Sequence, residues 1–259
     1  MARLLLTGLE LPRAVCEMGA LLPSGALLLR AGRGGEGQPV MCLPGFGAGD
    51  SSTVILRRFL RRWGYDSRPW GQGQHLNPVE ARSFDDVRRS FDRRRRDLEV
   101  ELRGVVEGSG QKVSLIGWSL GGILARWFAS HHPELVRQVI TLGTPFGDPR
   151  AVVVYPLMQR IHGKPMGERE LDEWLAMCRA PLSSDIPLSI IYSRSDGFVA
   201  PHIATDVQNS HIENIHIHSS HVGLTVNPLS LFVIADRLAQ PQLRWQPFAR
   251  RGWRELVFS

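Results

Sequence analysis

The sequence predicts an α/β fold, in which helices flank a mostly parallel β-sheet. From residue 39 onward, short apolar runs alternate with longer amphipathic segments, which is the pattern of buried strands joined by crossover helices. The chain has 259 residues, 43% hydrophobic and 22% charged, which is typical of a globular protein with a substantial core. We therefore expect a single domain over residues 1–259.

The expected strands are short and rich in β-branched residues. They span residues 40–43, 65–69, 113–116, 136–142, 188–192 and 212–217. One expected helix ends near Trp63. The other long helices are expected over residues 83–107, 122–130 and 228–239. Asp50, Ser51 or Ser52 can cap the first of these helices, and Gly64 suits the position after its end.

Three segments lie outside this alternation. Residues 1–38 form an N-terminal extension whose apolar stretch Leu21–Leu29 packs on the body, rests on a membrane surface or covers the substrate entrance. Residues 146–187 carry no obvious strand and are predicted to be a small helical cap. Its apolar residues form either a hydrophobic acyl site or ordinary packing, and they are Val152, Val153, Val154, Leu157, Met158, Trp174 and Leu175. The aromatic and basic tail, residues 244–258, is expected to pack back on the body.

Charge and cysteine usage exclude several classes of protein. The net charge is +6, yet the acidic neighbours of Arg93–Arg96 indicate a solvated helix face with paired charges rather than a nucleic-acid site. Cys16, Cys42 and Cys178 are far apart and odd in number, so we expect reduced, mostly buried thiols and no metal site. No segment is typical of a membrane span or a signal peptide, which favours a soluble, cytoplasmic protein.

The strongest chemical signal is the run Gly117-Trp118-Ser119-Leu120-Gly121. It follows an apolar strand and precedes a helix, where a sharp turn lifts a serine above the sheet. Such a turn strains the serine backbone and tolerates only small residues two positions before and after it. The helix N-terminus also favours negative charge that develops near the serine. We therefore predict Ser119 as a nucleophile.

A serine nucleophile needs a base, and the base needs an acid to orient it. On such a turn the acid and the histidine follow the serine in chain order, each on a loop after a strand. Asp196 and His221 occupy these places, with Asp148 and His218 as the second choices. Two further histidines in loops, His75 and His202, are candidates for contact with substrate.

Acyl transfer also needs two backbone N–H groups to bind the carbonyl oxygen as it becomes negative. Leu120, directly after the nucleophile, supplies one, and Phe46 in the loop after the first core strand supplies the other. Gly45 and Gly47 beside Phe46 allow substrate to approach the backbone closely. The loop lacks the lysine and the spacing of a nucleotide-binding loop, so we expect no nucleotide there.

Together, PGFGAGDSST, GWSLGG, ITLGTPFGDP, SRSDGFV and SSHVGL resemble the α/β-hydrolase superfamily, and within it bacterial esterases and lipases. The resemblance covers roughly residues 38–240. It implies Ser119, Asp196 and His221 as the catalytic triad, with no metal or organic cofactor. Pro44-Gly45 replaces the usual His-Gly, and Trp118 replaces a frequent histidine and is expected to contact substrate. Because the first 38 residues do not supply two leading strands, we expect about six strands.

These residues predict a serine carboxylic ester hydrolase that acts on a small-molecule or lipid ester. Acyl transfer to an alcohol or peroxide needs the same residues and stays open. Two other functions stay open. One is a pimeloyl-carrier-type methyl ester hydrolase, because the run GWSLGG also resembles those enzymes, and the other is a non-catalytic ligand-binding member of the fold. We expect no nucleic-acid partner, keep a peripheral membrane contact open, and make no prediction of oligomeric state.

Overall fold

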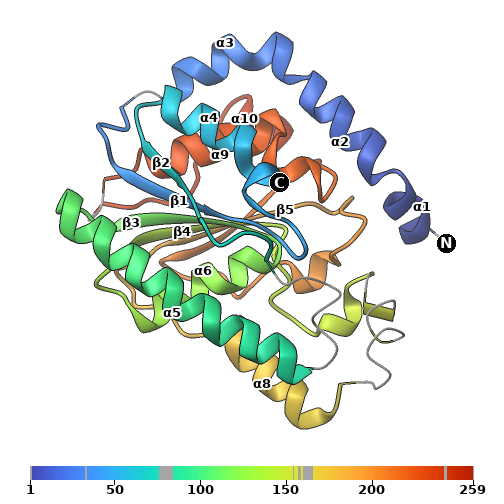
Figure 1. Cartoon of the computed structure of the whole chain (residues 1–259). Coiled ribbons are helices and arrows are strands. Elements are labelled where there is room, and N and C mark those ends of the chain that lie inside the picture. Colours follow the sequence, from blue (N-terminus) through green and yellow to red (C-terminus); the bar gives the residue numbers. More distant parts are fainter. Residues whose placement is uncertain are drawn as a thin grey trace.

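Figure 1 shows the computed structural model, in which a β-sheet lies between two layers of helices. It describes residues 2–32, 34–75, 84–153, 155–156, 159, 166–241 and 244–258. Six parallel strands form the sheet in the order β2-β1-β3-β4-β5-β6. Their bounds are β1 Pro39–Leu43, β2 Asp66–Pro69, β3 Val113–Trp118, β4 Val136–Leu142, β5 Leu188–Tyr192 and β6 Ile212–His216. The predicted fold class is therefore confirmed.

The sheet is buried on both faces because both sides of each central strand carry apolar residues. In β1, Met41 and Leu43 join the core on one face, while Val40 and Cys42 join the core on the other. This alternation follows from the two-residue repeat of a strand. It explains why the central strands appear in the sequence as continuous apolar runs.

Each face of the sheet has its own helices (Figure 1). One face packs against α5 Phe84–Ser109, α6 Leu120–His131 and α8 Glu168–Cys178. The other packs against α3 Leu21–Ala31, α4 Val54–Arg62 and α9 Pro228–Leu238. Short helices complete the described chain: α1 Ala2–Gly8, α2 Glu10–Gly19, η1 Asp50–Thr53, η2 Pro149–Ala151, η3 Pro201–Ile203, η4 Gly223–Thr225 and α10 Arg254–Val257.

The expected capping of the helix that ends near Trp63 was wrong. A turn of 3₁₀ helix, η1, precedes α4, and neither has a side-chain N-cap. The Asp50 carboxylate instead accepts hydrogen bonds from the Trp70 amide at 3.0 Å and the Gly71 amide at 3.3 Å. Asp50 therefore joins the loop after β1 to the loop after β2. Gly64 does follow the helix, with a φ of 91° that favours glycine.

The arginine cluster on α5 differs in part from the predicted solvated helix face with paired charges. The Arg95 guanidinium lies 4.0 Å above the Trp127 ring, and Arg94 donates to the Gln74 carbonyl at 2.9 Å. These two side chains pack inward against neighbouring elements. The expected (i, i+4) pairing occurs one turn later, where Arg103 donates to Glu99 at 2.8 Å.

The N-terminal extension forms three helices that arch over the outside of the body (Figure 1). Leu28 of α3 is buried against it, and its carbonyl accepts a hydrogen bond from the Trp63 indole at 2.9 Å. Leu22 and Leu27 of the same helix are exposed. Among the described residues, no single helix is long and apolar enough to cross a membrane. Taken together, α2 and α3 are long and apolar enough for a membrane span, but they are bent by 62° relative to each other.

The cap and the tail both pack on the body. Trp174 of α8 is 8% exposed and its indole donates to the Gly147 carbonyl, while Leu175 packs against the same core. Val152 forms an isolated bridge with Val199. These contacts favour ordinary packing over an acyl site. Val154, Leu157 and Met158 lie outside the described residues. In the tail, Phe248 and Phe258 are buried, as expected.

Two of the three cysteines are buried. Burial raises the pKa of Cys42 to about 12 and the pKa of Cys178 well above its usual value. Both thiols are therefore protonated and unreactive at neutral pH. Cys16 is exposed on α2, unlike the other two.

Candidate active site

Ser119 occupies a strained turn between β3 and α6. Its φ is 53° and its ψ is −121°, a conformation that side-chain-bearing residues rarely adopt. A Cβ on Gly117 would lie 2.4 Å from the Gly122 Cα, and a Cβ on Gly121 would lie 2.4 Å from the Leu43 carbonyl oxygen. Both glycines are therefore required by the closeness of the surrounding backbone.

The backbone of Ser119 is held from β4 and the loop after it. The Ser119 amide donates to the Leu142 carbonyl at 2.8 Å, and the Ser119 carbonyl accepts from the Thr144 hydroxyl at 3.0 Å. A Cβ on Gly122 would lie 1.9 Å from that hydroxyl oxygen. Sequence reasoning missed Thr144, although it lies in the quoted run ITLGTPFGDP.

Asp196 and His221 come together from the loops after β5 and β6. The His221 Nδ1 donates to Asp196 Oδ2 at 2.7 Å, and both side chains are nearly fully buried. The other carboxylate oxygen, Oδ1, accepts from the amides of Phe198 at 2.8 Å and Val199 at 2.7 Å. These bonds fix the carboxylate, and they engage His221 through Nδ1, so that Nε2 is the nitrogen on the other side of the ring.

The pKa of His221 is raised above its usual value. Burial is the largest influence and lowers it, but the charge and hydrogen bond of Asp196, together with the charge of Glu10, outweigh burial. The Trp118 indole donates to the His221 carbonyl at 3.0 Å, so the loop of His221 is bound to the residue before Ser119. We expected Trp118 to contact substrate, and the structure shows this contact with the base loop.

The second choices for acid and base lie elsewhere. Asp148 caps η2 and pairs with Arg150, whose Nε lies 2.7 Å from a carboxylate oxygen. His218 is exposed, and its ring packs against His216 at 5.0 Å between centroids. Among the described residues, neither Asp148 nor His218 contacts the pair formed by Asp196 and His221.

The loop after β1 lies against Ser119. A Cβ on Gly45 would lie 3.1 Å from the Ser119 Cβ, so glycine allows the loop to approach. Within the described chain, the Phe46 amide has no hydrogen-bond acceptor. The Leu120 amide belongs to the first turn of α6, where amides lack intrahelical acceptors. Both amides are therefore available to a ligand.

His75 stabilises this loop from within the core. It is fully buried, its Nδ1 donates to the Pro44 carbonyl at 2.9 Å, and its own carbonyl accepts from the Gly47 amide at 2.7 Å. Burial lowers the pKa of His75 to about 4, although the bond to Pro44 opposes this shift. The ring is therefore neutral, and the expected contact of His75 with substrate was wrong. His202 lies exposed in η3.

The sequence model of the α/β hydrolase fold family matches residues 39–176, more than half of the chain. The chain belongs to the α/β hydrolase fold family. The match includes Ser119 and ends before Asp196 and His221. The chain is also 34% identical over 97 residues to the biotin biosynthesis bifunctional protein BioHC of Teredinibacter turnerae. That alignment covers 33% of this chain and only 16% of the relative.

Solved structures share the fold of this chain at low sequence identity. Aspergillus fumigatus lipase B has a TM-score of 0.56 and 18% identity, over 82% of this chain and 57% of that protein. Monoglyceride lipase from Saccharomyces cerevisiae has a TM-score of 0.57 and 14% identity, over 81% and 88% of the two chains. Bacillus licheniformis lipase BlEst2 has a TM-score of 0.53 and 18% identity, over 80% and 94%. At such identities the likeness shows the fold alone.

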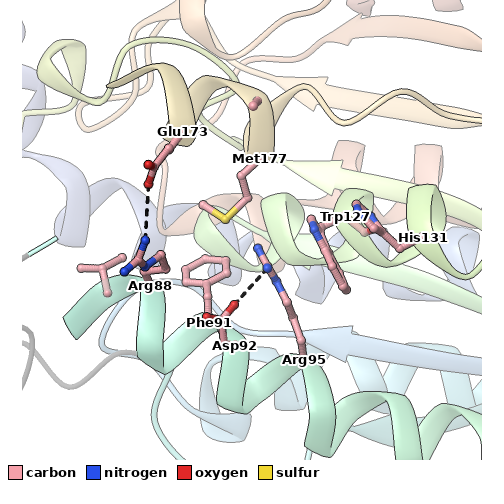
Figure 2. Close-up of a pocket in the computed structure, with 10 residues that line it drawn as sticks. Arg88, Phe91, Asp92, Arg95, Trp127, His131, Glu173 and Met177 are labelled. Carbon is pink, nitrogen blue, oxygen red and sulfur yellow. Dashed lines mark hydrogen bonds and ion pairs between the residues drawn. The ribbon is translucent and has the colours of Figure 1, made fainter. Parts of the chain in front are cut away.

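A separate pocket of about 310 Å³ lies between α5, α6 and α8 (Figure 2). The Arg88 guanidinium nitrogen lies 3.8 Å from a Glu173 carboxylate oxygen, and that of Arg95 lies 3.1 Å from an Asp92 carboxylate oxygen. Both arginines that line the pocket are therefore paired with carboxylates. Trp127 forms one wall. The described residues that line the pocket include none of Ser119, Asp196 and His221, so this pocket is distinct from the candidate active site.

Proposed function

We propose that this protein is a serine carboxylic ester hydrolase with Ser119 as nucleophile, His221 as base and Asp196 as the acid that orients the base. The observation that carries the proposal is the buried His221–Asp196 hydrogen bond of 2.7 Å. The His221 carbonyl also accepts a hydrogen bond from Trp118, the residue before the strained Ser119. Strained serines and buried acid–histidine pairs are costly to maintain, and the two together are typical of acyl transfer.

In the first step, the Ser119 Oγ attacks the ester carbonyl while His221 Nε2 takes the hydroxyl proton. The amides of Phe46 and Leu120 bind the oxygen as it becomes negative, and Asp196 stabilises the imidazolium. The tetrahedral intermediate then collapses, the carbon–oxygen bond to the alcohol breaks, and His221 gives its proton to the leaving alcohol. Ser119 is left as an acyl ester.

In the second step, water replaces the alcohol. His221 takes a proton from the water, which attacks the acyl carbon, and the same two amides bind the oxyanion. Collapse releases the carboxylic acid, and the proton returns from His221 to Ser119. Every proton is transferred among Ser119, His221, the alcohol and water.

A series of nitrophenyl esters from acetate to palmitate tests this proposal. We expect turnover by the wild-type protein and loss of nearly all of it in Ser119→Ala. Ser109→Ala, which removes an exposed hydroxyl at the end of α5, is the matched control and should keep wild-type rates. Full activity in Ser119→Ala would rule out the proposed nucleophile.

A methyl ester hydrolase is the second candidate. Two observations favour it: GWSLGG resembles the same run in pimeloyl-carrier-type methyl ester hydrolases, and the chain is 34% identical over 97 residues to a biotin biosynthesis bifunctional protein. Methyl and nitrophenyl esters of the same acyl group separate the two candidates. A clear preference for methyl esters in kcat/KM favours this candidate, and poor turnover of methyl esters argues against it.

A further inference from the structure

We propose that helix α2 is a positioning element of the active site, in which Glu10 fastens the loop of Asp196 to the loop of His221 and Glu17 anchors the loop of His221. The inference rests on the triad proposed above and adds residues of the N-terminal extension to it. The two loops follow different strands, and α2 contacts both of them.

Glu10 bridges the acid and base loops directly. Its side chain is 1% exposed. One carboxylate oxygen accepts from the amide of Gly197, the neighbour of Asp196, at 2.7 Å. The other accepts from the amide of Val222, the neighbour of His221, at 3.0 Å. A single carboxylate therefore holds the backbone on both sides of the His221–Asp196 pair.

Glu17 holds the base loop one residue before His221. Its Oε1 accepts from the Ser220 amide at 2.7 Å. Its Oε2 accepts from the Ser219 hydroxyl at 2.5 Å and from the Asn227 side chain at 3.0 Å. Such charge-assisted bonds are stronger than neutral ones, so Glu17 anchors the segment that leads into His221.

Further contacts keep α2 in place against the acid loop. Arg13 donates to the Ser195 carbonyl at 2.7 Å and to its hydroxyl at 2.9 Å. Glu10, Arg13 and Glu17 are three and four residues apart, so they share one face of the helix. Leu11 and Val15 on the other side are 69% and 61% exposed. Glu10, Arg13 and Glu17 therefore face the loops of Asp196 and His221, while Leu11 and Val15 face outward.

The charges near His221 come from two elements. Asp196 on the acid loop and Glu10 on α2 both favour the imidazolium, and Arg13, 3.9 Å from Glu10, partly offsets Glu10. His221 must be neutral to accept the serine proton. Removing the Glu10 charge therefore lowers the pKa of His221 and lets the base act at lower pH, whereas Glu17 influences His221 through loop position.

The pH dependence of kcat/KM for a nitrophenyl ester tests this inference. In Glu10→Gln we expect the acidic limb to move to lower pH and kcat to fall roughly tenfold with little change in KM, because the bridge is weakened. In Glu17→Gln we expect kcat to fall with the acidic limb unmoved. Val15→Ala on the exposed side of α2 and Glu107→Gln on α5 should match the wild type in both readouts.

Glu10→Asp separates charge from reach. It keeps the carboxylate but shortens the side chain by one methylene, so we expect a wild-type acidic limb with a lower kcat. It also provides the test if Glu10→Gln does not fold. A wild-type kcat and limb in Glu10→Gln, or a wild-type kcat in Glu10→Asp, would overturn the positioning role.

A titration of His221 by NMR, with its resonance assigned from His221→Gln, makes this test independent of ester turnover. We expect a lower His221 pKa in Glu10→Gln than in the wild type, even if no tested ester is hydrolysed. Failure of the ester assay alone would contradict the proposed function, whereas an unchanged His221 pKa would contradict the role of Glu10.

Discussion

The two sides of the proposed site are held in different ways: the Ser119 turn, here the nucleophile side, and the loops of Asp196 and His221, here the acid–base side. Ser119 is fixed by glycines that let its turn touch the backbone of the loop after β1, and by a bond from Thr144 that spans 25 positions. The loops of Asp196 and His221 are fixed by Glu10, whose bonds to Gly197 and Val222 span 187 and 212 positions. The geometry of the Ser119 turn therefore depends on close backbone packing against neighbouring strands and loops, while the geometry of the Asp196–His221 pair depends on a distant helix.

The kind of contact also differs between the two sides. On the nucleophile side, the neighbouring backbone leaves no space for side chains at Gly117 and Gly121, so steric exclusion sets the path of the backbone there. On the acid–base side, carboxylates accept hydrogen bonds from backbone amides, so charge and hydrogen bonding set it. Substitutions on the nucleophile side should therefore change both the stability of the fold and the rate of ester turnover. Substitutions on the acid–base side should change the rate of turnover and its dependence on pH.

The largest expected effect is on the acid–base side, in Asp196→Asn. The amide side chain keeps an oxygen for the amides of Phe198 and Val199, but its NH₂ group faces His221 Nδ1 and favours the wrong tautomer of the histidine. We expect kcat to fall roughly 10⁴-fold with the fold intact. Steady-state kinetics together with circular dichroism measures both.

Asp148→Asn is the matched control, because Asp148 is the alternative acid. Its ion pair with Arg150 is partly exposed, so we expect a wild-type kcat and a loss of stability below about 1 kcal/mol. A collapse of activity in Asp148→Asn with activity retained in Asp196→Asn would reverse the assignment.

On the nucleophile side, Gly121→Ala should damage folding and rate together. The new Cβ would lie 2.4 Å from the Leu43 carbonyl oxygen, which is backbone and cannot turn aside. We expect the free energy of unfolding to fall by about 3 kcal/mol. Urea denaturation measures the change. Gly104→Ala in α5, where nothing lies within 4 Å, should instead stabilise the protein by up to about 1 kcal/mol.

His75 gives the nucleophile side a pH dependence of stability. The pKa of His75 is about 4 in the folded protein against 6.5 for an unperturbed histidine, so between these values the unfolded state binds a proton that the folded state does not. Unfolding free energy should therefore fall as the pH drops from 6.5 to 4, by roughly 3 kcal/mol from this group. Urea midpoints across this range measure it.

His75→Asn is the variant for this test, since its side chain can still donate to the Pro44 carbonyl but cannot titrate. We expect a weaker dependence of stability on pH in the variant. His216, whose pKa burial also lowers to about 4, supplies part of the remaining dependence. An unchanged pH dependence in His75→Asn would show that His75 is already charged in the folded protein.

The smallest expected effect is that of Thr144→Val. The substitution keeps the shape of the side chain and removes the hydrogen bond to the Ser119 carbonyl. That carbonyl still accepts from the Gly122 amide at 3.0 Å, so it is not left unpaired. We expect a loss of about 1 kcal/mol in the free energy of unfolding, measured by thermal denaturation. A loss of several kcal/mol would mean that the Ser119 turn depends on this side chain.

The sequence predicted the sheet and the nucleophile turn well because their signals are local. Buried parallel strands appear as apolar runs, so β4 and β5 were predicted to the residue. The glycines around Ser119 indicate a crowded turn without reference to any distant residue. Asp196 and His221 were found from chain order alone, and the structure pairs them.

The missed residues act across long separations. Glu10 interrupts an apolar run in the sequence, but nothing local indicates that it reaches the amides of Gly197 and Val222. The spacing of Glu10, Arg13 and Glu17 was the available signal, because three charged residues on one face of an otherwise apolar helix need partners. His75 was misplaced for a related reason, since a loop position suggested exposure while Trp70 and Phe91 enclose its ring.

The most direct test of the central claim is the mass of the trapped acyl-enzyme. The wild-type protein and Ser119→Ala are treated with an activated ester or a fluorophosphonate, digested and analysed by mass spectrometry. We predict one added acyl or phosphonyl group on the peptide that contains Ser119, and none on the same peptide of the variant. An adduct on another residue, or ester turnover that persists in Ser119→Ala, would contradict the account.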